Sequence, residues 1–203
     1  MTKAFDFGKN WQSFINNYLN DERIDEAKKS LCNFLEMENL KRKTFLDVGC
    51  GSGLFSLAAI KLGAEKVVSF DVDPYSVKCA EALYKNEGSP SNWQIFEGSI
   101  LDESLIKSIG TFDIVYSWGV LHHTGDMWKA IDNVCHLVKK DGLLYIAIYN
   151  RADGLAIYPD GRFGPSKFWK FEKRIYSKLP LFLQNVIEFF VMSFLILAYI
   201  LTF

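Results

Sequence analysis

Apolar positions along the chain follow two periods, and their alternation predicts a mixed α/β fold. Short apolar runs of four to six residues are typical of buried strands, whereas apolar residues repeating every three or four positions indicate helices. The predicted strands are Thr44–Val48, Lys66–Phe70, Trp93–Phe96, Phe112–Tyr116 and Leu143–Ile148. The predicted helices that separate them are Leu54–Leu62, Asp73–Tyr84 and Thr124–Val138. Gly63 is placed to end the first of these helices, and Asp73 followed by Pro74 is placed to begin the second.

Two further amphipathic helices precede the first strand. The first carries its apolar side chains at Trp11, Phe14, Ile15 and Tyr18. After a break at Asn20 and Asp21, the second carries them at Ile24, Ala27, Leu31, Phe34 and Leu35. We expect both helices to form a cap over the carboxyl edge of the sheet.

Strands that alternate with helices at this spacing predict βαβ units and a mostly parallel, doubly wound sheet. The last predicted strand follows a turn at Asp141 and Gly142. We expect three parts: an N-terminal helical cap over residues 1–43, a sheet core over residues 44–150, and a C-terminal segment over residues 151–203. No strand is evident after the fifth, so the sheet is expected to be shortened.

Composition restricts the class of protein and its partners. The net charge is −1, with 49% apolar and 23% charged residues, which favours an ordered globular protein without electrostatic attraction to nucleic acid. The four cysteines are scattered, with no pair at zinc-binding spacing, so we expect reduced thiols, no structural metal and a cytoplasmic location. The first residues contain no apolar core of a signal peptide.

The loop after the first predicted strand is rich in glycine and is the main candidate for ligand binding. Gly49, Gly51 and Gly53 form GxGxG, which differs from the GxGxxG of dinucleotide-binding loops because Leu54 stands where the last glycine is needed. Glycines at this edge of a doubly wound sheet let the backbone approach a ligand. Asp71 ends the second strand at about the spacing expected of an acid that binds ribose hydroxyls.

Three motifs in order, DVGCGSG, SFDVDP and FDIVYSWGVLHH, resemble those of class I S-adenosylmethionine-dependent methyltransferases, with a Rossmann-like fold. The chain is most similar to the branch that contains the ubiquinone-biosynthesis O-methyltransferases. The resemblance covers roughly residues 5 to 150 and implies S-adenosyl-L-methionine as the cofactor.

The resemblance also implies a set of cofactor-binding residues. Asp47 and the backbone of the loop would hold the methionine part, Asp71 the ribose, and Val72 the adenine. Ser99 stands where many relatives carry an acid near the adenine amino group, beside Ile100. The positions implied are Trp11, Asp47, Gly49, Cys50, Gly51, Gly53, Asp71, Val72, Ser99, Ile100, Ser117 and Trp118. Of these, Trp11 is expected either to close over the cofactor or to be a core aromatic side chain.

Two adjacent histidines are the candidates for acid–base chemistry. His122 and His123 follow the fourth strand at the ligand edge, and a histidine can accept the proton of a hydroxyl acceptor near neutral pH. We favour His123, with a structural role for both as the alternative. Tyr149, Asn150 and Arg151 follow the fifth strand at the same edge and are further candidates for contact with the acceptor.

The C-terminal segment over residues 166–203 has a different character. Its first part interleaves basic and aromatic residues, which suits either an anionic membrane surface or a solvated helix. The run Phe189–Phe203 has no charged residue but is shorter than the about 20 residues of a full membrane span. It is expected either to associate with lipid or to cover the edge of the sheet.

The sequence therefore predicts a methyltransferase that acts on a small or lipid-like acceptor, with O-methylation favoured and the acceptor itself left open. Two alternatives remain: a protein that binds S-adenosylmethionine without catalysis, and a nucleotide-dependent oxidoreductase on the same fold.

Overall fold

A computed structural model describes residues 8–149, 175–176 and 179–202. The chain divides into two compact units, Met1–Tyr149 and Asn150–Phe203, which we call the core unit and the C-terminal unit.

The core unit is built on a five-stranded, entirely parallel sheet. Its strands are β1 (Thr44–Val48), β2 (Lys66–Asp71), β3 (Trp93–Glu97), β4 (Phe112–Trp118) and β5 (Val138–Ala147). Their order across the sheet is β3-β2-β1-β4-β5. The order reverses at β1, so the glycine-rich loop after β1 lies at the switch point where ligands bind such sheets. The predicted doubly wound fold is confirmed.

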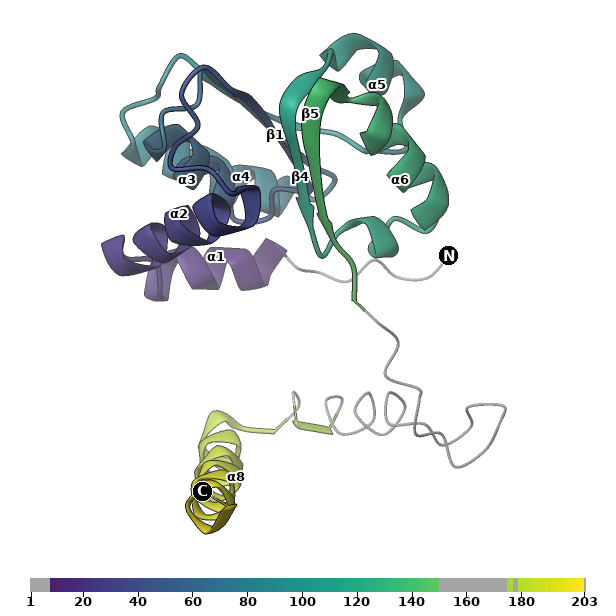
Figure 1. Cartoon of the computed structure of the whole chain (residues 1–203). Coiled ribbons are helices and arrows are strands. Elements are labelled where there is room, and N and C mark those ends of the chain that lie inside the picture. The colour runs from purple at the N-terminus through teal and green to yellow at the C-terminus, as the bar shows by residue number, and fades with distance from the viewer. Residues whose placement is uncertain (1–7, 150–174, 177–178, 203) are drawn as a thin grey trace. The chain divides into compact units, whose positions relative to one another are not determined.

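Helices cover both faces of the sheet (Figure 1). One face carries α1 (Gly8–Asn17), α2 (Asp21–Leu35), α3 (Leu54–Lys61) and α4 (Pro74–Asn86). The other carries α5 (Glu103–Ile109) and α6 (Met127–His136), and a short 3-10 turn, η1 (Leu121–His123), connects β4 to α6. Burial on both faces explains why the strands read as continuous apolar runs.

Of the two helices expected to cap the carboxyl edge of the sheet, α2 differs from the expectation. In α2, Ala27, Leu31 and Leu35 are buried with Phe45 and Leu57, so this helix packs on a face of the sheet next to α3. The stripe of apolar residues along α2 is wide enough to join the core, which explains its place there. The helix α1 packs along α4.

Local signals fix several ends of elements. The Asp73 carboxylate accepts a hydrogen bond from the backbone N–H of Tyr75 and caps α4, and Gly63, with φ of +83°, follows the end of α3 as predicted. The predicted turn at Asp141–Gly142 is wrong as a strand boundary, because β5 already begins at Val138. These two residues lie instead in an irregularity of the β4–β5 pairing, where Asp141 has φ of +64°.

The C-terminal unit contains one long helix, α8 (Leu181–Thr202). Gln184 on its first turn donates hydrogen bonds to the carbonyls of Tyr176 and Leu179. No helix among the described residues reaches the length and hydropathy needed to cross a membrane.

Candidate cofactor and active site

The glycine-rich loop is tied to the end of the neighbouring strand. The backbone N–H groups of Gly49 and Cys50 both donate to the carbonyl of Phe70, at 2.9 and 3.1 Å. The protein's own hydrogen bonds therefore hold the loop at the carboxyl edge, between β1 and α3.

At each glycine of the loop, a different neighbouring residue occupies the space that a side chain would need. All three have positive φ, at +73° for Gly49, +54° for Gly51 and +80° for Gly53. A Cβ atom on Gly49 would overlap Val120, one on Gly51 would lie 2.9 Å from the Trp11 indole, and one on Gly53 would lie 2.8 Å from Ala80. The loop thus forms a cradle into which no side chain of its own can fit.

Trp11 lies directly against this cradle. Its ring atoms Cε2 and Nε1 are the ones nearest to Gly51, and 37% of the residue is exposed. The helix α1 therefore places an aromatic ring at the edge where the resemblance puts the cofactor.

Asp71, at the end of β2, faces the loop. Its two carboxylate oxygens accept hydrogen bonds of 2.9 Å from the backbone N–H groups of Gly51 and Asp73. Burial raises the pKa of this carboxyl, although these hydrogen bonds oppose the shift. Each oxygen can accept a further hydrogen bond, so Asp71 can still receive a pair of hydroxyls. Val72 follows it, 64% exposed at the same edge.

Asp47 lies beneath the loop with only 2% of its surface exposed. Its Oδ2 accepts a 2.5 Å hydrogen bond from the Ser56 hydroxyl of α3. Burial raises the pKa of Asp47 to about 7, and the nearby Asp71 adds to the effect. Cys50, the next side chain in the loop, is also buried, and burial raises the pKa of its thiol.

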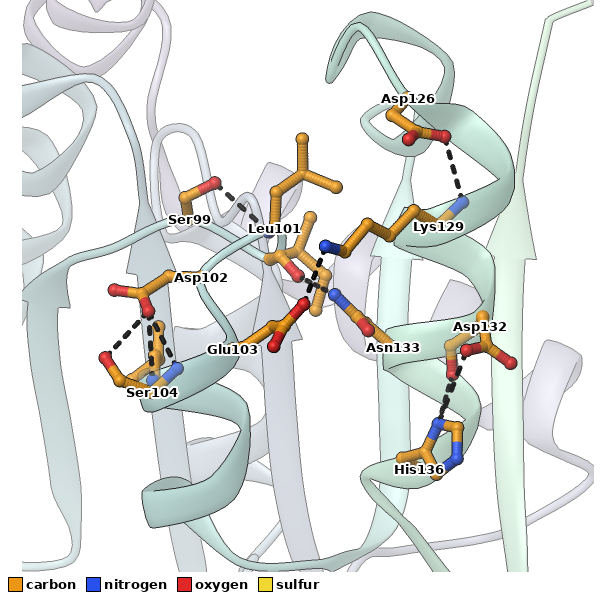
Figure 2. Close-up of polar contacts among 12 residues, drawn as sticks. Ser99, Leu101, Asp102, Glu103, Ser104, Asp126, Lys129, Asp132, Asn133 and His136 are labelled. Atoms are coloured by element: carbon orange, nitrogen blue, oxygen red, sulfur yellow. Dashed lines mark hydrogen bonds and ion pairs between the residues drawn. The ribbon is translucent and has the colours of Figure 1, made fainter.

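The segment expected near the adenine is fixed from two sides, as Figure 2 shows. The Ser99 hydroxyl accepts the backbone N–H of Leu101 at 3.1 Å, so this residue shapes its own turn. The Asn133 side chain, reaching from α6, donates a 2.7 Å hydrogen bond to the buried carbonyl of Ile100. Lys129 and Glu103 join α6 to α5 by an ion pair of 2.8 Å.

Ser117 and Trp118, at the end of β4, have different environments. The Ser117 hydroxyl is fully buried and donates to the carbonyl of Val48, so it joins the ends of β4 and β1. Trp118 is 41% exposed and stacks on Tyr145, with Phe34 of α2 beside both rings. Of this pair, only Trp118 presents a side chain at the surface of the edge.

The two histidines are distinguished by their surroundings. Both ring nitrogens of His122 are buried without a hydrogen-bond partner among the described residues. Its ring lies 4.9 Å from that of Tyr149 and 4.0 Å from that of His123. Burial lowers the pKa of His122 and so favours the neutral imidazole, the form that can accept a proton. His123 is exposed.

Several residues of this edge were missed by sequence reasoning. Val120, Ser56 and Asn133 each contact the site through packing or hydrogen bonds between elements, and no local motif marks them. Asn150 and Arg151, which were expected near the acceptor, lie outside the described residues. The described part of the chain contains no group of three His, Cys, Asp or Glu side chains that could hold a metal ion.

Comparison with known protein families identifies the core. Residues 46–146, which contain the loop, Asp71 and both histidines, match the family described as "Methyltransferase domain". The core unit is a class I S-adenosylmethionine-dependent methyltransferase domain. Its cofactor is therefore S-adenosylmethionine. The match spans β1 to β5 and thus all the strands of the sheet.

Relatives of this methyltransferase domain belong to more than one branch. The chain is 37% identical over 87 residues to the ribosomal protein L11 methyltransferase of Vibrio campbellii, covering 42% of this chain and 30% of that protein. It is 29% identical over 144 residues to the ubiquinone biosynthesis O-methyltransferase of Rhizobium rhizogenes, covering 70% and 55% respectively. The chain therefore spans about a third to a half of the length of these relatives.

Solved structures share the fold of the methyltransferase domain. One from Methanococcus maripaludis, named as an S-adenosyl-L-methionine-dependent methyltransferase, has a TM-score of 0.58 with 20% identity, over 72% of this chain and 65% of that one.

The residues present in the domain fit this cofactor. The cradle of glycines leaves backbone accessible, Asp71 provides a carboxylate for two hydroxyls, and the buried Asp47 provides a carboxyl group beneath the loop. When bound, S-adenosylmethionine supplies a methyl group that its positively charged sulfur already activates.

Proposed function

We propose that this protein transfers a methyl group from S-adenosylmethionine to an oxygen of a small or lipid-like acceptor. The observation that carries the proposal is the pair of buried nitrogens of His122, which have no hydrogen-bond partner among the described residues and lie beside Tyr149, at the edge that also holds the glycine loop. A neutral imidazole without a protein partner is suited to accept the proton of a hydroxyl group as it is methylated. No such base is required for an acceptor that is already deprotonated.

In this proposal the domain's residues have separate tasks. Asp71 receives the ribose hydroxyls, Val72 packs on the adenine and Asp47 holds the ammonium group of the methionine part. The loop backbone and Trp11 enclose the cofactor, and Trp118 and Tyr149 border the acceptor. Alignment of the acceptor with the methyl group then supplies most of the rate enhancement.

The exposed apolar helix α8 supports a lipid-like acceptor. Four consecutive residues, Phe189 to Met192, are each more than half exposed, and four consecutive helical positions point to all sides of a helix. A helix that is apolar all round is typical of lipid or of a buried core. We infer association with a membrane surface, from the cytoplasmic side.

A protein acceptor is the second candidate. The L11 methyltransferase of Vibrio campbellii is among the relatives with the higher identity, and its name gives a ribosomal protein as the substrate. Methylation of a protein side chain by this chain would use the same cofactor site with a different acceptor surface.

Incubation with methyl-labelled S-adenosylmethionine tests the proposal directly. The protein is offered a lipid extract, a set of phenolic small molecules and purified ribosomal proteins, and labelled products are separated by class. Label in a lipid or phenol fraction is the expected result. Label confined to protein would favour the second candidate, and binding without any transfer would support a non-catalytic protein.

An Asp71→Asn variant tests the cofactor site. The amide keeps the shape but removes the charge that receives the ribose hydroxyls, so affinity for S-adenosylmethionine should fall by about 10- to 100-fold. Asp73→Asn is the matched control two residues away, because asparagine caps a helix as well as aspartate does. Calorimetry that gave both variants wild-type affinity would contradict the assignment of Asp71.

A further inference from the structure

A chain of buried hydrogen bonds runs across three strands beneath the glycine loop. The Trp93 indole N–H on β3 donates to the Ser69 hydroxyl on β2 at 2.9 Å. The Ser69 hydroxyl donates to the Ser56 hydroxyl on α3 at 2.8 Å, and Ser56 donates to the Asp47 carboxylate at 2.5 Å. The four residues are between 0% and 3% exposed. We call Trp93, Ser69 and Ser56 the hydroxyl relay.

The direction of the relay is fixed by its first member. An indole N–H can only donate, so Ser69 has to accept from it and give its single proton to Ser56. Ser56 in turn gives its proton to Asp47. Every dipole of the chain therefore points its positive end at the carboxylate, and successive hydrogen bonds aligned in this way strengthen one another.

Asp47 has no cationic partner within the part of the chain that the structure describes. The ionisable groups that face it are Asp71 from β2, Cys50 from the loop and Tyr116 from β4, while α3 contributes only Ser56. None of these groups is positively charged, and Asp71 repels a negative charge on Asp47. Among the described groups around Asp47, the hydroxyl and the backbone N–H of Ser56 favour its ionised form, and the relay orients that hydroxyl toward the carboxylate.

We propose that Trp93, Ser69 and Ser56 are positioning residues that keep the Asp47 carboxylate charged and oriented toward the ammonium group of the cofactor's methionine part. This inference rests on the proposed role of Asp47 in cofactor binding. It assigns a function to a buried tryptophan on β3, two strands away from β1.

The effect on Asp47 can be measured without any ligand. Carbon NMR of the side-chain carboxyl follows its titration in the full chain with labelled aspartate, with Asp47→Asn used to assign the signal. Removing a donor to the charged form raises the pKa, by about one unit for Ser56→Ala and about half a unit for Ser69→Ala. Trp93→Phe, which keeps an aromatic ring, should shift it in the same direction by less. Unchanged titration in Ser69→Ala and Trp93→Phe would overturn the relay.

The consequence for the cofactor is measured by calorimetry with S-adenosylhomocysteine over a series of pH values. Affinity for S-adenosylhomocysteine should fall at low pH, as Asp47 becomes protonated. In each relay variant, the pH at which this fall occurs should rise by the same amount as the pKa of Asp47. Thr44→Val is the matched control, because it removes a bonded hydroxyl at the opposite end of β1. It should lower stability without moving this pH.

The outcomes separate the two proposals. Shifted Asp47 titration together with a shifted affinity profile supports the relay as a positioning device. Shifted titration with an affinity profile that stays in place overturns its role in cofactor binding. A wild-type chain that bound no S-adenosylhomocysteine at any pH would instead overturn the proposed function, and the carboxyl titration would still report on the relay.

Discussion

At the scale of single residues, Asp47 combines a role in the site with an unfavourable position for folding. Its carboxyl is buried, and its pKa in the folded protein, about 7, lies above the value near 4 of an unfolded chain. A group with a raised pKa contributes full stability below its unfolded value and loses it as the pH rises through the folded one. The folded protein should therefore lose stability between about pH 4 and 7 through this residue.

Asp47→Asn should remove that loss. The amide can still accept the Ser56 hydrogen bond but carries no charge, so the free energy of unfolding at pH 8 should rise by about 2–4 kcal/mol. At pH 4 the variant and the wild type should be equally stable. Urea unfolding at the two pH values measures the difference, and a variant less stable than the wild type at pH 8 would contradict it.

His122 leads to a kinetic prediction. If oxygen is the atom methylated, His122→Ala should lower the turnover rate by about 100-fold while the cofactor affinity is kept. Because burial holds the pKa of His122 below its ordinary value, the wild-type rate should stay constant from about pH 7 to 9 and fall only in acid. His123→Ala is the control, and an equal loss of rate in both variants would argue against His122 as the base.

Residues that belong to an ordered local motif were predictable, and those defined by distant contacts were not. Gly49, Gly51 and Asp71 follow from the loop and its spacing to the end of β2. The need for glycine at position 49 also depends on Val120, which comes 71 positions later and carries no local signal. The preference for His123 over His122 rested on position alone, whereas the burial of each imidazole depends on η1 and Tyr149.

At the scale of elements, Asp113 joins three strands at the edge opposite the loop. Its Oδ2 accepts hydrogen bonds from the backbone N–H and the hydroxyl of Thr44 on β1, at 2.8 and 2.6 Å. It also forms an ion pair of 2.9 Å with Lys139 on β5. These donors hold the pKa of Asp113 well below its ordinary value despite partial burial.

Asp113→Asn should therefore destabilise the core unit in a pH-dependent way. A depressed pKa contributes stability above the unfolded value, near 4, and loses it as the pH falls toward the folded value. The variant should be less stable by about 2 kcal/mol at pH 7, and the difference should shrink below about pH 4. Thermal unfolding across this pH range measures the difference in stability. The Lys139→Met variant removes only the ion pair, so its effect shows how much of the difference comes from the hydrogen bonds with Thr44.

The elements themselves were predicted unevenly. Strands β1 to β4 and helices α3, α4 and α6 were found because each has a clear apolar period or cap. Helix α5 was missed because its seven residues contain no fully buried side chain, although Asp102 caps it by accepting from Ser104 and Leu105. The start of β5 was placed too late because Lys139, Lys140 and Asp141 resemble a polar turn, whereas in the structure they lie within β5, at an irregularity of its pairing with β4.

At the scale of the whole molecule, α8 predicts association with lipid. The full chain should float with liposomes that contain anionic lipid, and a version ending at Lys178 should stay in the soluble fraction while still binding S-adenosylhomocysteine. Substituting Phe189 and Phe194 with serine in the full chain should weaken flotation, because both side chains are more than two-thirds exposed. Serine in place of Phe34, an exposed aromatic of the core unit, is the control. A full chain that ignored liposomes would show that α8 is covered by protein instead.

The three contacts of the glycine loop also have a consequence for how the domain folds. Gly49 requires Val120 from beyond β4, Gly51 receives Trp11 from α1, and Gly53 packs on Ala80 of α4. The helices α1 and α4 and the segment after β4 must therefore all be packed against the loop before it reaches its native conformation. We therefore expect the loop to acquire order late in refolding, and its amide hydrogens to become protected from exchange after those of β1 and β2. A newly made chain would then gain the ability to bind its cofactor only when the rest of the domain is already assembled.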